Sequence, residues 1–151
     1  SGLMVLALDA DSHRELSRQF HDRITQKRYI AMIAGSPQQA SGSVELPLRC
    51  DWENRPKQVV DHQQGKHALT HYRVLEQRPD QARVELTPIT GRSHQLRVHM
   101  QSMGHPILGD RFYANAAALK QADRLLLHAQ QLGFNHPLSQ QPLSFVAPSP
   151  F

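Results

Sequence analysis

The sequence predicts an α+β fold in which a mainly antiparallel sheet carries a few helices. Most of the chain consists of short segments rich in β-forming residues and separated by turn residues, and only two stretches repeat their apolar residues at helical spacing. The 151 residues, 39% of them hydrophobic, fit one domain of ordinary size with a modest core. No repeat or linker divides the chain, so we expect a single domain over residues 1–151.

The chain begins with an apolar segment and continues into a helix. Residues 3–8 follow a Ser-Gly turn and predict a buried strand. Ser12, with Glu15 three positions later, has the form of a capping box, which predicts a helix over residues 12–24. The apolar side chains of this helix recur every four residues: Leu16, Phe20 and Ile24.

Three segments of different character come next. Residues 29–34 predict a strand that ends at the turn signal of residues 35–37. Residues 42–48 are short and contain Pro47, so we expect an edge strand or one arm of a hairpin. Residues 51–66 are polar and contain proline and glycine, which predicts an exposed loop.

The second half of the chain supplies most of the expected sheet. Residues 68–75 and 82–86 alternate in polarity on either side of a turn at residues 78–81, which predicts an antiparallel pair. Residues 125–134 and 143–146 are the last predicted strands.

A second helix is predicted from an N-cap at Ser93 to Gly104, with Pro106 beyond its end. At 100° per residue its side chains divide into two faces. The core face holds Leu96, Met100 and Met103, and the opposite face holds His94, Arg97, Val98 and Gln101. Arg92 precedes a helix N-terminus that itself attracts anions, so a phosphate or carboxylate is one interpretation of this face, and a solvated polar face is the other.

Composition bounds the possible partners. Seventeen Lys and Arg against thirteen Asp and Glu give a formal charge of +4, which is compatible with a polyanionic partner such as nucleic acid. The single cysteine, Cys50, excludes an internal disulfide and a cysteine-based zinc site. His94 and His99 would point about 140° apart on a helix, which is poor for a shared ion, so we expect no metal. No apolar run is long enough to span a membrane and no secretory signal is present, so we expect a cytoplasmic protein.

Longer motifs carry a family resemblance. Residues 91–97 (Gly-Arg-Ser-His-Gln-Leu-Arg), followed by residues 104–110 (Gly-His-Pro-Ile-Leu-Gly-Asp) and Tyr113, closely resemble the paired signatures of the ribosomal large-subunit pseudouridine synthase family. Residues 27–31 are similar to its tyrosine motif, and residues 124–129 to its late apolar strand. Two further stretches are similar to the synthase A branch of this family: residues 51–58 and 88–114.

The resemblance implies a cofactor-free isomerase that converts uridine in RNA into pseudouridine. In the family an aspartate attacks the nucleotide, the base detaches and rotates, and its carbon 5 is joined to the sugar, after the nucleotide has been flipped into a pocket. Tyr29 matches the residue that stacks on the flipped base and handles a proton, and Arg97 matches the arginine that pairs with the aspartate. The residues expected to contact RNA are Arg92, His94, Lys57 and Arg111.

The nucleophile of the family lies in a His-Arg-Leu-Asp segment, which this chain lacks. Residues 1–3 resemble the end of the stretch that follows that segment, so we expect the aspartate upstream of Ser1 and no catalysis by this chain alone. Asp9 and Asp11 fit turn and capping roles instead. A non-catalytic RNA-binding module derived from the family is the alternative. The synthase A resemblance implies a monomer that acts on a stem-loop uridine of large-subunit ribosomal RNA, and on a uridine in a transfer RNA anticodon arm.

Overall fold

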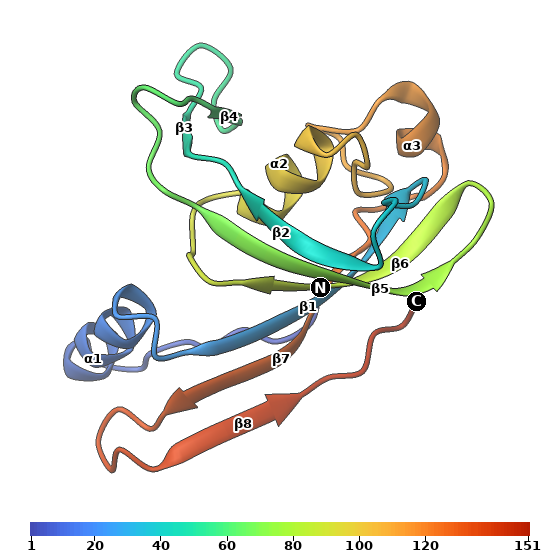
Figure 1. Ribbon diagram of the computed structural model, residues 1–151. Coiled ribbons are helices and arrows are strands. Elements are labelled where there is room, and N and C mark those ends of the chain that lie inside the picture. The colour runs from blue at the N-terminus through green and yellow to red at the C-terminus, as the bar shows by residue number, and fades with distance from the viewer.

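The computed structural model describes residues 1–151 and contains one large sheet, one small sheet and three helices (Figure 1). The large sheet has six strands in the order β2-β5-β6-β1-β7-β8, and every neighbouring pair is antiparallel. In chain order the elements are α1 (Ala10–His21), β1 (Gln26–Ala34), β2 (Ser41–Glu45), β3 (Leu48–Cys50), β4 (Gln58–Val60), β5 (Leu69–Gln77), β6 (Gln81–Pro88), α2 (Gln95–Ser102), α3 (Ala116–Lys120), β7 (Leu127–Asn135) and β8 (Pro142–Val146). The α+β class and the antiparallel sheet predicted from the sequence are confirmed.

The core lies between the sheet and α2. Figure 1 shows α2 and α3 on one side of the sheet, together with the small β3–β4 sheet. Alternate residues of β6 are fully buried, and Leu96 and Met100 of α2 pack against them. The predicted apolar face of this helix is therefore confirmed. The main core cluster consists of Ala31, Ile33, Val44, Tyr72, Ala82, Val84, Leu86, Leu96, Met100 and Ile107.

The N-terminal segment differs from its prediction. Only its first residues join the sheet, where Leu3 N–H donates to Ala129 at 2.9 Å and Ala129 N–H donates to Ser1 at 2.9 Å. The chain then leaves β7, and the side chains of Met4, Leu6 and Leu8 are exposed. The predicted buried strand over residues 3–8 was wrong, because an apolar run becomes a strand only where a neighbouring strand accepts its hydrogen bonds.

Helix α1 begins before the predicted capping box. Asp9 is the N-cap, and its carboxylate accepts from the backbone N–H and the hydroxyl of Ser12, both at 2.8 Å. Ser12 therefore lies inside the first turn of the helix, although the sequence predicted it as the N-cap. Glu15 pairs with Arg18 instead of reaching back to the cap. Asp and Ser are both strong N-caps, and of the two candidates Asp9, which comes first in the chain, caps the helix.

The stretch expected to be a loop is partly ordered into the small sheet. β3 and β4 pair antiparallel, with Leu48 opposite Val60, so the prediction of an exposed loop over residues 51–66 was only partly right. Pro47 divides the predicted 42–48 strand into β2 and β3, as its missing N–H favours. None of the three helices is long and apolar enough to cross a lipid bilayer.

Helix α2 is shorter than predicted and is buried on both sides. It starts at Gln95, and the preceding His94 has left-handed backbone (φ 52°), so Ser93 is not the N-cap. Val98, which the periodicity placed on the functional or solvated face, is buried. His99, to which the periodicity gave no face, is buried as well. The helix ends as predicted, at Gly104 (φ 82°), where His105 N–H donates to Met100 at 3.0 Å.

Candidate active site

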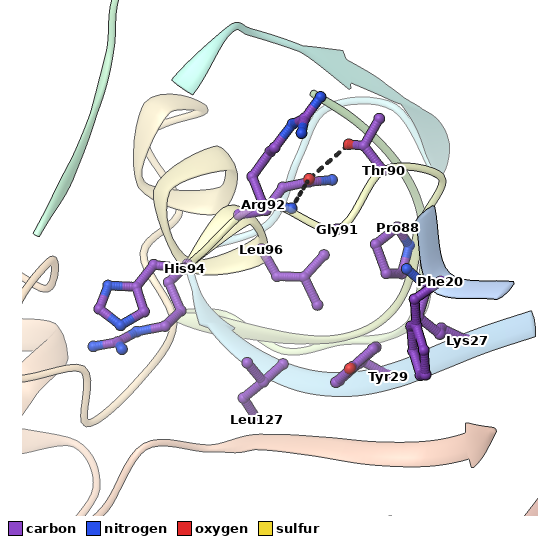
Figure 2. Close-up of a pocket in the computed structure, with 12 residues that line it drawn as sticks. Phe20, Lys27, Tyr29, Pro88, Thr90, Gly91, Arg92, His94, Leu96 and Leu127 are labelled. Atoms are coloured by element: carbon purple, nitrogen blue, oxygen red, sulfur yellow. Dashed lines mark hydrogen bonds between the residues drawn. The ribbon is translucent and has the colours of Figure 1, made fainter. Parts of the chain in front are cut away.

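A hollow of about 400 Å³ opens between β1, the end of α1 and the turn that leads into α2 (Figure 2). One part of its wall is apolar and the other is cationic. The lining residues are Phe20, Lys27, Tyr29, Pro88, Thr90, Gly91, Arg92, His94, Gln95, Leu96, Arg97 and Leu127. Such a mixed wall suits a planar ligand whose ends are polar or negatively charged.

Tyr29 and Phe20 provide the aromatic side chains of the hollow. Tyr29 lies on the central strand β1, opposite Leu86 of β6 and Ala129 of β7, so hydrogen bonds on both sides fix its backbone. Leu127 of the neighbouring strand β7 and Leu96 of α2 line the hollow with it (Figure 2). Burial raises the pKa of Tyr29, so its hydroxyl is protonated at neutral pH.

The buried amide of Gln95 holds the turn before α2. Its Oε1 accepts from the Thr90 hydroxyl at 2.6 Å and from Arg92 N–H at 3.0 Å, as Figure 2 shows. Its Nε2 donates to the Leu69 carbonyl at 2.9 Å and to the Thr70 hydroxyl at 3.0 Å. All four hydrogen-bonding positions of the amide are therefore used. This fixes the turn that brings residues 91–94 to the hollow.

His99 continues the same network into the core. Its Nδ1 lies 2.9 Å from the Thr70 hydroxyl and its Nε2 lies 3.0 Å from the Leu46 carbonyl, so Nε2 carries the proton and Nδ1 accepts. Burial lowers the pKa of His99, which agrees with a neutral ring. His99 is thus a structural residue that ties α2 to the sheet.

Arg97 is held by a buried carboxylate. Its Nε donates to Asp110 Oδ2 at 2.8 Å and its Nη2 donates to Oδ1 at 2.7 Å, a bidentate pair. Asp110 is fully buried, and Oδ1 also accepts from the backbone N–H groups of Phe112 and Tyr113. Burial alone would raise the pKa of Asp110, but the hydrogen bonds from Arg97 and from these backbone groups outweigh it and lower the pKa.

Two aromatic rings complete the support of Arg97. Its guanidinium carbon lies 5.1 Å from the Phe112 ring centre and 5.0 Å from that of Tyr113. Nη1 makes no hydrogen bond within the chain, whereas Nε and Nη2 are both used by Asp110. The guanidinium is therefore oriented firmly and keeps one nitrogen for a further acceptor.

His94 is connected to Arg97 through Tyr113. The Tyr113 hydroxyl accepts from Gln58 N–H at 2.8 Å, so its proton points to His94 Nδ1 at 2.7 Å. Burial lowers the pKa of His94, and the charge of Arg97 lowers it further. A neutral ring with a proton on Nε2 follows from this arrangement.

Four of the six site residues predicted from the sequence line the one hollow: Tyr29, Arg97, Arg92 and His94. Lys57 precedes β4 and Arg111 is an exposed residue beside Asp110, and neither lines the hollow. Their expected contacts with RNA stay predictions. No group of three or more His, Cys, Asp or Glu side chains has an arrangement that could hold a metal ion.

The sequence interpretation assigned no role to Lys27 or Asp110, although both stand in the quoted motifs. Lys27 could have been found, because it lies two positions before Tyr29 on a strand and therefore on the same face. Asp110 follows no periodic pattern, since it lies in an irregular segment between α2 and α3.

Comparisons with known proteins agree on one family. The model of the family described as RNA pseudouridylate synthase matches residues 1–102. The chain is 55% identical over 152 aligned residues to a dual-specificity RNA pseudouridine synthase of Escherichia coli strain K12, and 53% identical to its namesake from Yersinia pestis. These alignments cover all of this chain but only 69% and 74% of the two relatives.

Solved structures lead to the same family. Human RNA pseudouridylate synthase domain containing 1 superposes with a TM-score of 0.81 at 30% identity, over 96% of this chain and 63% of the human one. Human RNA pseudouridylate synthase domain containing 4 superposes with a TM-score of 0.73 at 31% identity, over 97% of this chain and 66% of the human one. The chain thus spans about two thirds of the length of these proteins.

Proposed function

Because the chain belongs to the RNA pseudouridylate synthase family of RNA-modifying isomerases, we propose that the protein containing it converts specific uridines into pseudouridine in the hollow beside Tyr29. The observation that carries this proposal is the meeting of Tyr29, from β1, with Arg97, from α2, in one hollow of about 400 Å³. The two residues are 68 positions apart in the sequence numbering, and the packing of α2 against the sheet brings them together.

Tyr29 supplies the surface on which the flipped uracil would stack. A base inside a paired or stacked RNA is out of reach, so it must leave the stack at a cost of roughly a few kcal/mol. Stacking on an aromatic ring returns about 1–3 kcal/mol of this. Leu96 and Leu127 make the rest of the wall apolar, and the protonated hydroxyl of Tyr29 is available to exchange a proton with the base.

Arg97 would pair with the nucleophilic aspartate that the family resemblance places in another segment of the protein. Its Nη1 is unpaired within this chain and can donate to that carboxylate, while Asp110 holds the other edge of the guanidinium. A neighbouring guanidinium lowers the pKa of a carboxyl group and so keeps it ionised for attack. Asp110 is not itself a candidate nucleophile, because it is fully buried and both of its oxygens accept hydrogen bonds.

The substrate follows from the cationic side of the hollow and from the relatives. Arg92 and His94 line the hollow, and we assign them, with Lys57 and Arg111, to contacts with RNA. The dual-specificity name of the bacterial relatives supports two kinds of RNA substrate. From the synthase A resemblance we propose that these are a stem-loop of large-subunit ribosomal RNA and a transfer RNA anticodon arm. From the same resemblance we expect a cytoplasmic monomer, and no cofactor, because the aspartate nucleophile carries the implied reaction.

Tritium release from RNA labelled at carbon 5 of uridine tests the proposal. The full-length protein should release tritium from ribosomal and transfer RNA stem-loops, and an Arg97→Ala variant should not. Arg78→Ala is the matched control, because Arg78 pairs with Glu76 at the β5–β6 turn and lines no hollow near Tyr29. Absence of release by the folded full-length protein on both RNAs would refute the proposed function.

A further inference from the structure

A cationic groove adjoins the hollow on the side of α1. It consists of two connected hollows of about 300 and 640 Å³, and Arg23 and Lys27 line both of them. Lys27 also lines the hollow beside Tyr29, so the groove leads directly to the proposed base pocket. We call it the side groove and define it by Arg23, Thr25, Lys27, Arg28 and Arg92.

Most of the positive charge of the side groove is not neutralised within the chain, because only Arg28 among its lysine and arginine residues is paired, with Glu85 at 3.4 Å. Arg23 and Lys27 form no ion pair with any carboxylate. The one acidic residue in its walls, Asp22, is already paired with Arg18 at 3.2 Å and with His21 at 2.9 Å. The groove therefore attracts an anion.

Lys27 lies close to the positive charge of Arg23. Its burial lowers its pKa, and the charge of Arg23 lowers it further. Its Nζ lies 3.5 Å from the place where a side chain at Gly91 would begin, so it is positioned against the turn that forms the mouth of the base pocket. A bound anion would relieve both the repulsion and the desolvation.

Arg23 occupies a backbone position that favours glycine. It follows the C-cap of α1 with φ 60°, and Ile24 N–H donates to the Gln19 carbonyl at 3.0 Å, which is the hydrogen bond of a Schellman motif. Helix α2 ends in the same way, with Gly104 at the equivalent position. A strained arginine where the fold elsewhere uses glycine indicates that its side chain is needed for something other than stability.

Thr25 adds a hydrogen-bonding group to the same wall. Its Oγ1 is the one buried side-chain polar atom of the chain without a hydrogen-bond partner. A buried hydroxyl without a partner is unfavourable and is uncommon in folded proteins. An oxygen-bearing ligand in the groove would supply an acceptor once the atoms that cover this hydroxyl in the free chain move aside.

We propose that the side groove binds a phosphodiester of the RNA next to the flipped uridine, with Arg23 and Lys27 as its principal contacts. The proposal rests on the proposed function and names residues to which the family resemblance gave no role. Phosphate contacts of this kind carry no sequence information but fix the register of the RNA backbone. Here they would hold the strand so that the target nucleotide faces Tyr29.

Fluorescence anisotropy of a labelled stem-loop RNA, titrated with the full-length protein at several salt concentrations, measures these contacts. Lys27→Gln and Arg23→Gly should each weaken binding several-fold. Each should also reduce the slope of log affinity against log salt by about 0.7–0.9, the loss of one phosphate contact. Arg78→Gln removes the same charge at a distance from the groove and should change neither quantity.

Arg23→Gly also separates RNA binding from folding. Glycine relieves the left-handed backbone, so the variant should unfold about 2–4 °C higher than the wild type while binding RNA more weakly. A variant that lost affinity because it was damaged would unfold at a lower temperature. Opposite changes in stability and affinity therefore support the groove.

The outcomes distinguish this proposal from the proposed function. Wild-type affinity and salt slope in both groove variants, in a protein that still releases tritium, would overturn the groove and leave the isomerase. Equal effects of Arg78→Gln and Lys27→Gln would overturn it as well, because any cation would then serve. A protein that releases no tritium but loses affinity through the groove variants would refute the isomerase and support the groove.

Discussion

Replacing Asp110 by asparagine removes the buried charge that orients Arg97 while preserving the shape of the side chain. The amide oxygen can still accept from Phe112 and Tyr113, but the amide nitrogen then faces an Arg97 N–H, donor against donor. Removing one partner of a buried ion pair typically costs about 3–5 kcal/mol. Because the Arg97 side chain is 15% exposed and so partly hydrated, we expect the lower end, about 3 kcal/mol.

Urea unfolding followed by circular dichroism measures this free energy. Asp11→Asn is the control, since Asp11 and Arg14 form a pair whose side chains are 79% and 78% exposed, and its loss should change stability by less than about 0.5 kcal/mol. An Asp110→Asn protein as stable as this control would refute the view that the pair anchors α2 and Arg97. Turnover should fall more than RNA affinity, because the change acts on the orientation of Arg97.

The acid dependence of stability gives the same test a second readout. The pKa of Asp110 is lowered in the folded protein, so its stabilisation is complete above the unfolded value of about 3.9. It is lost as the pH falls through the folded pKa. The difference in stability between the wild type and Asp110→Asn should therefore be constant near neutral pH and shrink below about pH 4.

Three further predictions concern the residues around the hollow. Arg97→Ala should reduce turnover far more than RNA affinity, whereas Arg92→Ala should weaken RNA binding as well; unchanged turnover in Arg97→Ala would contradict its assignment. Tyr29→Phe keeps the stacking ring, so stem-loop affinity should hold while tritium release slows by about 100-fold, and an undiminished rate would restrict Tyr29 to stacking. Gln95→Ala leaves buried polar groups of Thr90 and the backbone without hydrogen-bond partners, so urea unfolding should show a free energy of unfolding lower by about 2–4 kcal/mol. A loss below about 1 kcal/mol would contradict the view that the Gln95 amide fixes the turn before α2.

The elements that periodicity predicted well are those whose burial is set by two neighbouring strands. Residues 29–34 lie in β1, residues 69–75 in β5 and residues 82–86 in β6. Alternate side chains of β6 meet the core, whereas residues 30–33 of the central strand β1 are all buried. Residues 3–8 have an equally apolar sequence but no partner strand beyond Leu3. An apolar composition indicates that a segment tends to be buried. Whether a neighbouring strand is present to pair with that segment depends on the arrangement of the whole sheet.

The site was predictable to the extent that it lies on long motifs. The resemblance assigned catalytic roles to Tyr29 and Arg97; both residues line one hollow, and the roles themselves stay predictions. It gave no indication that Arg97 is held by Asp110, since that contact joins a helix to an irregular segment 13 positions later and depends on tertiary folding. The side groove escaped the sequence for a similar reason, because it is assembled from the end of α1, the start of β1 and the turn before α2.

Backbone strain in this chain is concentrated at the proposed RNA-binding surface. Three residues other than glycine have positive φ, and two of them, Arg23 and His94, line the side groove and the base pocket. At His94 the Tyr113 hydroxyl holds the imidazole ring, and the Gln95 amide fixes the preceding residue by accepting from Arg92 N–H. Such conformations persist only where the surroundings over-determine them. The hydrogen-bond network of Gln95, Thr70 and His99 is therefore a rigid support for the mouth of the hollow. It allows a residue other than glycine to keep a left-handed backbone conformation there.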